Sequence, residues 1–155
     1  DKWNWDTKDE TNIYLDVESR KNSITYRSNI SRLVDQLIVE KNYDEAEKLI
    51  DKCMLKFPVD KYGYYTLLEP FIGSYYKINK TKKARELFDE ISKKYQENLF
   101  YYSNLRNVNK NRYAEEIYID IERYRSLLDT IISYEEGEFL DLRMKDFNDY
   151  LDLFL

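Results

Sequence analysis

The sequence predicts an all-α fold of helical hairpins, and three observations carry this prediction. Apolar residues recur at an offset of 38 residues over two helix-length segments. Within each segment they are spaced three and four apart, as one helical face followed by a second. The chain of 155 residues holds only three Gly and two Pro, which disfavours an all-β fold rich in turns. The matched residues are Ile30, Leu33, Val34, Leu37, Ala46, Leu49, Ile50, Cys53 and Phe57, then Leu68, Phe71, Ile72, Tyr75, Ala84, Leu87, Phe88, Ile91 and Tyr95.

Residues 1–22 are expected to form an N-terminal arm, and residues 23–155 a single helical-repeat domain. The arm is polar, with Trp3, Trp5 and the apolar cluster at 13–15 as its only anchors. We expect the arm to pack on the first hairpin.

The first hairpin is expected to span residues 23–58. Ser23 is a suitable N-cap for its first helix, which ends near Glu40. Lys41 and Asn42 make the turn. The second helix then begins with acidic residues and is stopped at Phe57 and Pro58.

The second hairpin is expected to span residues 64–96. Pro70 favours a helix start near Glu69, because the missing N–H of proline is tolerated in a first helical turn. The turn falls at residues 79–81, and the partner helix follows.

After residue 96 the 38-residue register fails. A short helix near 97–106 and a polar break at 107–111 are expected to precede a longer hairpin over 112–155. Gly137 is expected to supply the left-handed cap at the end of its first helix. Terminal repeats are often atypical because they cover the open end of the core, which fits this longer hairpin.

Composition and charge exclude several classes of function. The net charge of −5, with both signs interspersed, gives no basic stripe for nucleic acid. The chain has no run of 18 apolar residues that would span a membrane. The sixteen tyrosines have two interpretations, as ring-filled seams between helices or as an exposed surface for a sugar or peptide.

The sequence offers little for catalysis or for a cofactor. It contains no His, the commonest general base and metal ligand. The carboxylates lie mostly at helix-surface spacings, and no glycine-rich phosphate loop is present. The acidic run at 135–138 is interpreted as a solvated turn, and Cys53 as a core residue. We therefore expect no enzymatic activity, no cofactor and no metal.

The hairpins resemble tetratricopeptide repeats, which form an α-α superhelix. The residues that carry the resemblance are Leu33, Val34, Tyr43, Ala46, Ile50 and Pro58, then Phe71, Ile72, Tyr75, Ala84 and Phe88. The sequence departs from the motif at Asn42 and Lys80, where glycine is common, and at Gln96, where the second proline would be.

Stacked hairpins of this kind would present an inner groove suited to an extended peptide, with Tyr76 as a stacking wall and Lys77 as a charge contact. Alternatively, the N-terminal arm fills that groove through Trp3 and Trp5. The residues expected to line it are Ser28, Ser31, Asp35 and Ile38, then Thr66, Glu69, Gly73, Tyr76 and Lys77.

A second resemblance covers nearly the whole chain. It rests on Ile13-Tyr14-Leu15-Asp16, Tyr26-Arg27, Arg32-Leu33, the turn before Ala46, Phe57-Pro58, and Tyr75-Tyr76-Lys77-Ile78 before Lys83-Ala84. These elements are similar to the soluble C-terminal region of the bacterial membrane-protein family known as domain of unknown function 2723. That family is common among Bacteroidetes and distantly similar to membrane-bound protein O-mannosyltransferases.

The second resemblance implies that a multi-pass membrane region precedes Asp1 in a longer parent and carries any glycosyl-transfer chemistry. The present chain would then be a soluble accessory domain, on the periplasmic side. Arg27 and Arg32 resemble family positions, and either could pair with Asp16 to pin the arm.

The expected function is that of a non-catalytic interaction or assembly module. Its partner would be a protein or peptide, including the membrane region of its own parent. The alternative is a carbohydrate-recognition module that uses exposed aromatic rings.

Overall fold

The computed structural model describes residues 15–135 and 137–154, and these residues form helices without a strand. The prediction of an all-α fold is therefore confirmed for the described part of the chain. The chain divides into two compact units, the first ending at Ile78 and the second beginning at Asn79. Each unit is described by itself below.

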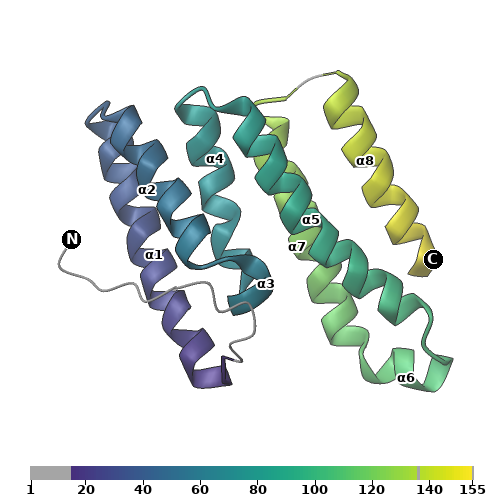
Figure 1. Ribbon diagram of the computed structural model, residues 1–155. Helices are drawn as coiled ribbons and strands as arrows, with labels where there is room; N and C mark the ends of the chain where they lie inside the picture. The colour runs from purple at the N-terminus through teal and green to yellow at the C-terminus, as the bar shows by residue number, and fades with distance from the viewer. Residues whose placement is uncertain (1–14, 136, 155) are drawn as a thin grey trace. The chain divides into compact units, whose positions relative to one another are not determined.

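The first unit is arranged around one long helix, α1, which packs against both α2 and α4 (Figure 1). Its elements are α1 (Val17–Val39), α2 (Tyr43–Lys56), α3 (Val59–Tyr62), the 3-10 helix η1 (Tyr65–Leu68) and α4 (Glu69–Lys77). The helix α4 begins at Glu69 with Pro70 in its first turn, as predicted. Its side chains join those of α1 and α2 in an apolar core that includes Val34, Ile50, Leu68, Phe71 and Ile72, all 0% exposed.

The start of α1 corrects one prediction. The N-cap is Asp16 and not Ser23, so the first six residues of α1 belong to the segment predicted as an arm. The Asp16 carboxylate accepts hydrogen bonds from the backbone N–H groups of Glu18 and Ser19 at 2.9 and 3.0 Å. Ser23 is buried inside the helix, where its hydroxyl donates to the carbonyl of Arg20. Both residue types cap helices well, and sequence alone did not distinguish between them.

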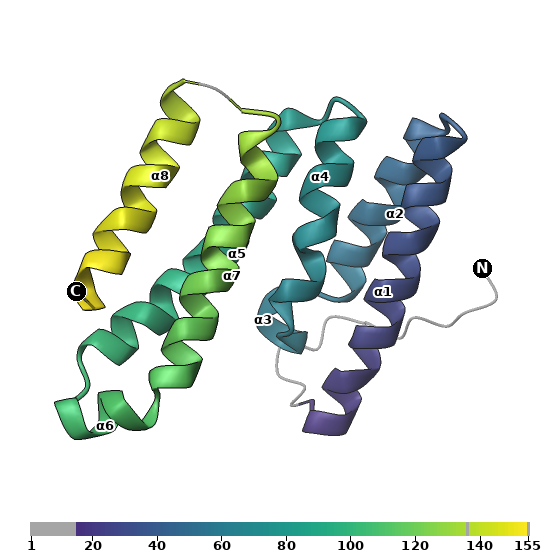
Figure 2. The same cartoon turned by 180° about the vertical axis from the view of Figure 1, so that it is seen from behind.

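The described residues of the second unit form three long helices and two short ones. Figures 1 and 2 show their arrangement. Its elements are α5 (Thr81–Ser103), α6 (Asn107–Arg112), α7 (Ala114–Ile132), α8 (Glu138–Leu151) and the 3-10 helix η2 (Asp152–Phe154). The helix α7 runs back along α5, and α8 returns beside both, so α5 and α8 run in the same direction.

Three predictions for the second unit were wrong. The helix α5 continues to Ser103, so there is no separate helix at 97–106, and α6 occupies the predicted polar break. Because the buried stripe Leu87, Ile91, Tyr95 and Leu99 keeps steps of four, nothing ends the helix near residue 96. Gly137 has φ +72°, but it precedes α8 and does not cap α7, which ends at Ile132.

Aromatic rings fill the seams between α5, α7 and α8. Tyr95 stacks on Tyr124, with ring centroids 6.0 Å apart. Phe147 meets the Tyr124 ring edge-on at 5.1 Å. Both tyrosines are 0% exposed. These contacts support the interpretation of ring-filled seams for these two tyrosines. Other tyrosines are exposed, namely Tyr26, Tyr43, Tyr101, Tyr118 and Tyr134.

The helix ends repeat at the offset found in the sequence. The helices α1 and α4 end at Val39 and Lys77, and α2 and α5 begin at Tyr43 and Thr81, 38 residues apart in each case. In the turns between them, Lys41 and Asn79 adopt left-handed backbone conformations with φ +59° and +60°. The offset therefore extends from residue type to local backbone conformation.

Among the described residues, no helix is long and apolar enough to cross a membrane.

Candidate functional site

A hollow of about 410 Å³ lies between α5 and α8 in the second unit. The spacing of its α5 residues places them on one helical face, and three α8 residues spaced three and four apart form the opposite wall. The lining residues are Asp89, Ser92, Lys93, Gln96, Glu97 and Phe100 from α5, and Arg143, Asp146 and Tyr150 from α8.

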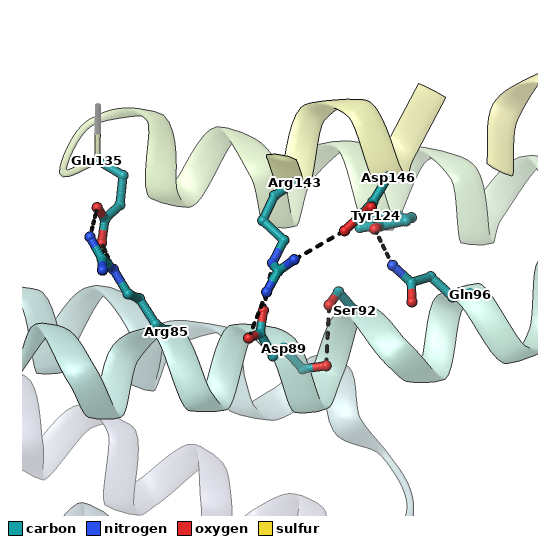
Figure 3. A network of polar contacts seen from close by, with 8 residues as sticks. All are labelled: Arg85, Asp89, Ser92, Gln96, Tyr124, Glu135, Arg143 and Asp146. Atoms are coloured by element: carbon teal, nitrogen blue, oxygen red, sulfur yellow. Dashed lines mark hydrogen bonds and ion pairs between the residues drawn. The ribbon is translucent and has the colours of Figure 1, made fainter. Parts of the chain in front are cut away.

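Arg143 forms the polar centre of the hollow (Figure 3). Its Nε and Nη2 donate to the two carboxylate oxygens of Asp89 on α5, at 2.7 and 2.9 Å. Its Nη1 donates to Asp146 on α8 at 3.1 Å. The bonds to Asp89 and Asp146 raise the pKa of Arg143 above its ordinary value, against the opposing effect of burial. Because two carboxylates already surround this guanidinium, it is poorly placed to bind an external anion.

A second arginine fork joins α5 to the link between α7 and α8, just after α7 ends. Arg85 donates from Nε and Nη2 to the carboxylate of Glu135 at 2.8 and 2.6 Å (Figure 3). The guanidinium carbons of Arg85 and Arg143 lie 4.6 and 5.0 Å from the centre of the Phe139 ring. One aromatic ring thus contacts both arginines, a cation–π arrangement that helps to hold α8 against α5.

Two amide side chains of α5 donate hydrogen bonds to residues of α7. Gln96 donates to the hydroxyl of Tyr124 at 2.7 Å (Figure 3), and burial raises the pKa of Tyr124 to about 12. Nearer the end of α5, Asn98 donates to Asp120 at 3.0 Å. Burial raises the pKa of Asp120 above its ordinary value. These hydrogen bonds fix side-chain positions between α5 and α7.

The hollow contains charged groups of both signs. Its carboxylates are Asp89, Glu97 and Asp146, and its cations are Lys93 and Arg143. The two aspartates share Arg143, so they do not have the contrasting environments that an acid–base pair needs.

No family model matches the chain. Comparison with curated proteins and with solved structures likewise gave no significant match. The resemblances to tetratricopeptide repeats and to the membrane-protein family therefore stay predictions.

The predicted groove residues all lie in the first unit. Ser28, Ser31, Asp35 and Ile38 are on α1, Thr66 is in η1, and Glu69, Gly73, Tyr76 and Lys77 are on α4. The packing of α1 against η1 and α4 brings these elements together. Asp35 and Lys77 are exposed, but Tyr76 is only 8% exposed, which leaves little of its ring for stacking on a ligand.

The residues predicted to pin the arm make other contacts. Asp16 accepts hydrogen bonds from Glu18 and Ser19 as the cap of α1. Arg27 is fully buried and donates to the carbonyls of Phe57, Gly63 and Tyr64, while Arg32 is exposed. The arm anchors Trp3 and Trp5 lie outside the described residues.

A second hollow, of about 250 Å³, lies between α1 and α2 in the first unit. It is lined by Tyr26, Ile30, Leu49, Lys52, Cys53, Lys56 and Phe57. Cys53 is 2% exposed, and burial raises the pKa of its thiol to about 11. This placement confirms Cys53 as a core residue. None of the predicted groove residues lines either hollow.

The acidic run at 135–138 differs from the solvated turn that was predicted. Glu135 is 4% exposed and bonded to Arg85, whereas Glu138 is exposed. Within 15–135 and 137–154, no group of three or more Asp, Glu, His or Cys side chains is arranged to hold a metal ion.

The α5–α8 hollow was not among the predicted sites. The available signal was the second face of α5, where Asp89, Ser92, Gln96 and Phe100 follow helical steps. That face is recognisable only if α5 is taken to continue beyond residue 96. Arg143, the partner of Asp89 on α8, lies 54 residues further along the chain, and no local sequence pattern predicts a pair at that separation.

Proposed function

We propose that this chain is a non-catalytic interaction module built from tetratricopeptide-like hairpins, whose partner is a protein or peptide. The observation that carries the proposal is the recurrence of helix ends and of left-handed turn residues at 38 residues. Repeats of helical hairpins commonly serve as binding scaffolds.

The hydrogen bonds that several described carboxylates accept also support binding over catalysis. Asp89 and Glu135 are each engaged by an arginine fork, Asp146 by a single N–H group of Arg143, and Asp120 by an amide. Groups held in this way position helices and shape a surface.

We further propose that the module is an accessory domain of a membrane-anchored parent resembling a glycosyltransferase, on the periplasmic side. The support is the sequence resemblance over residues 13–84. Sequencing the parent gene upstream of Asp1 tests this proposal. Several apolar spans of about 20 residues would support it, and a parent without such spans would refute it.

Titration of the domain with unstructured peptides and with glycans, followed by Tyr and Trp fluorescence, tests the interaction function. Saturable binding of peptides is the expected result. Saturable binding of glycans alone would refute the proposal in favour of the carbohydrate-recognition alternative, which the exposed rings Phe100, Tyr101 and Tyr118 make a reasonable competitor.

A direct assay tests the non-catalytic part of the proposal. We expect the isolated domain to transfer no sugar. Activity that disappears on replacement of a single carboxylate would contradict this expectation.

A further inference from the structure

The two walls of the α5–α8 hollow carry the same pair of chemical groups. On α5, Glu97 is followed three residues later by Phe100, and on α8, Asp146 is followed four residues later by Tyr150. Both spacings place the ring next to the acid on the helix surface. Phe100 is 60% exposed, so a large part of its ring is available to a ligand.

Helix direction adds to the negative potential at this end of the hollow. The helices α5 and α8 run in the same direction and end at Ser103 and Leu151, within one turn of Phe100 and Tyr150. The carboxyl end of a helix carries a partial negative charge that favours cations. Two such ends therefore lie near the two rings.

Of the two acids, Glu97 is the one that the positive groups of the hollow leave accessible. Arg143 lies deeper, with its guanidinium bonded to both Asp89 and Asp146. Lys93 and Lys94 lie 4.0 and 3.7 Å from the Glu97 carboxylate, and Glu97 is 52% exposed. Exposed ion pairs of this length are weak, so a ligand cation competes with them readily.

We propose that the hollow binds an arginine side chain of the partner peptide. A guanidinium is planar, stacks on aromatic faces and donates to carboxylates in a fork, so it suits Phe100, Tyr150 and Glu97 together. The inference rests on the proposed interaction function and names the partner chemistry at one site.

The test uses two small probes that differ in charge but hardly in shape. The full chain, labelled with ¹⁵N, is titrated with N-acetyl-arginine-N-methylamide and with the corresponding citrulline compound, and chemical shifts are followed by NMR. We expect saturable millimolar binding of the arginine probe, with shifts centred on Gln96, Phe100 and Tyr150, and much weaker binding of the neutral probe.

Matched variants assign the binding to the hollow. Phe100→Leu and Glu97→Gln should each weaken binding of the arginine probe roughly three- to tenfold. The controls are Tyr118→Leu and Asp129→Asn, which alter an exposed ring and an exposed acid on α7 outside the hollow. These controls should leave the affinity unchanged.

Equal binding of the two probes, no saturable binding, or equal losses in hollow and control variants would each overturn the inference. If peptides still bind the domain in the fluorescence titration, the interaction function stands and only the arginine site is refuted. If no peptide binds at all, the function itself fails.

Discussion

Arg27 donates to three carbonyl groups from a fully buried position on α1. The acceptors are Gly63 and Tyr64, at 2.5 and 3.1 Å from Nη1, and Phe57, at 2.6 Å from Nη2. Phe57 follows the end of α2, Gly63 follows α3, and Tyr64 precedes η1, where its carbonyl also accepts the backbone N–H of Leu67. Buried carbonyls at helix ends need such donors. One side chain therefore fixes the path of the chain between α2 and α4.

Replacement of this side chain tests its structural role. Arg27→Met should lower the free energy of unfolding by about 3 kcal/mol, because it leaves three carbonyls without this donor at roughly 1 kcal/mol each. Urea denaturation followed by circular dichroism measures the change. Arg32→Met, the same substitution at an exposed position on α1, is the control and should change stability little. Equal effects of the two substitutions would contradict the assigned role.

The Cys53 thiol provides a second test at the residue scale. Burial raises its pKa from 9.0 to about 11. At pH 8 the thiolate fraction should therefore be roughly a hundredfold lower than for a free cysteine, and burial slows access further. We expect very slow modification by a thiol reagent in the native state. A Cys53→Ser chain carrying Ser133→Cys, at an exposed site, should react fast. Similar rates at the two positions would remove Cys53 from the core.

At the scale of single elements, the two left-handed turn residues carry strain that glycine would relieve. A lysine with φ +59° is disfavoured, whereas asparagine tolerates the conformation better. Lys41→Gly should raise stability by about 0.5 to 1 kcal/mol, and Asn79→Gly by less. Thermal unfolding of both variants measures which substitution raises stability more. Glu40→Gly, next to Lys41 but at φ −74°, should instead lower stability. A loss of stability in Lys41→Gly would contradict the prediction.

Helix boundaries could be predicted wherever a local signal marks them. Pro70 correctly gave the start of α4 at Glu69, and the turns near Lys41 and Asn79 were expected where they occur. The start of α1 was missed because Asp16 and Ser23 are equally good caps. The length of α5 was missed because its apolar stripe crosses the point where the repeat register ends.

The candidate site could not be predicted in the same way. The pairs Asp89–Arg143 and Arg85–Glu135 join residues 54 and 50 positions apart. A single sequence contains many acids and arginines at comparable separations, and only packing of α8 on α5 selects these partners. Glu135 illustrates the difficulty, because an acidic run is usually solvated, yet this carboxylate is buried against Arg85.

For the whole molecule, the absence of histidine predicts an unusual pH profile. Histidine is the side chain whose ordinary pKa lies between about pH 5 and 8, and this sequence has none. The free energy of unfolding should therefore be nearly constant between roughly pH 6 and 8.

Above roughly pH 8 the free energy of unfolding should fall. The buried Cys53 and Tyr124 keep their protons to about pH 11 and 12, whereas the unfolded chain releases them near 9.0 and 10.0. The native state then binds more protons, so rising pH favours unfolding. Urea denaturation at a series of pH values measures both regimes. Cys53→Ser should flatten the early part of the decline, and a steep change between pH 6 and 8 would contradict the prediction.

The contact of Phe139 with two arginine forks also bears on which insertions and deletions the chain can accept. Each added residue turns the rest of a helix by about 100°, so one residue inserted between Phe139 and Arg143 would carry the guanidinium away from both Asp89 and the ring. An insertion beside Gly137, outside both helices, would leave the spacing from Phe139 to Arg143 intact. Length variation among natural relatives of this chain should therefore occur before α8 and spare its first two turns.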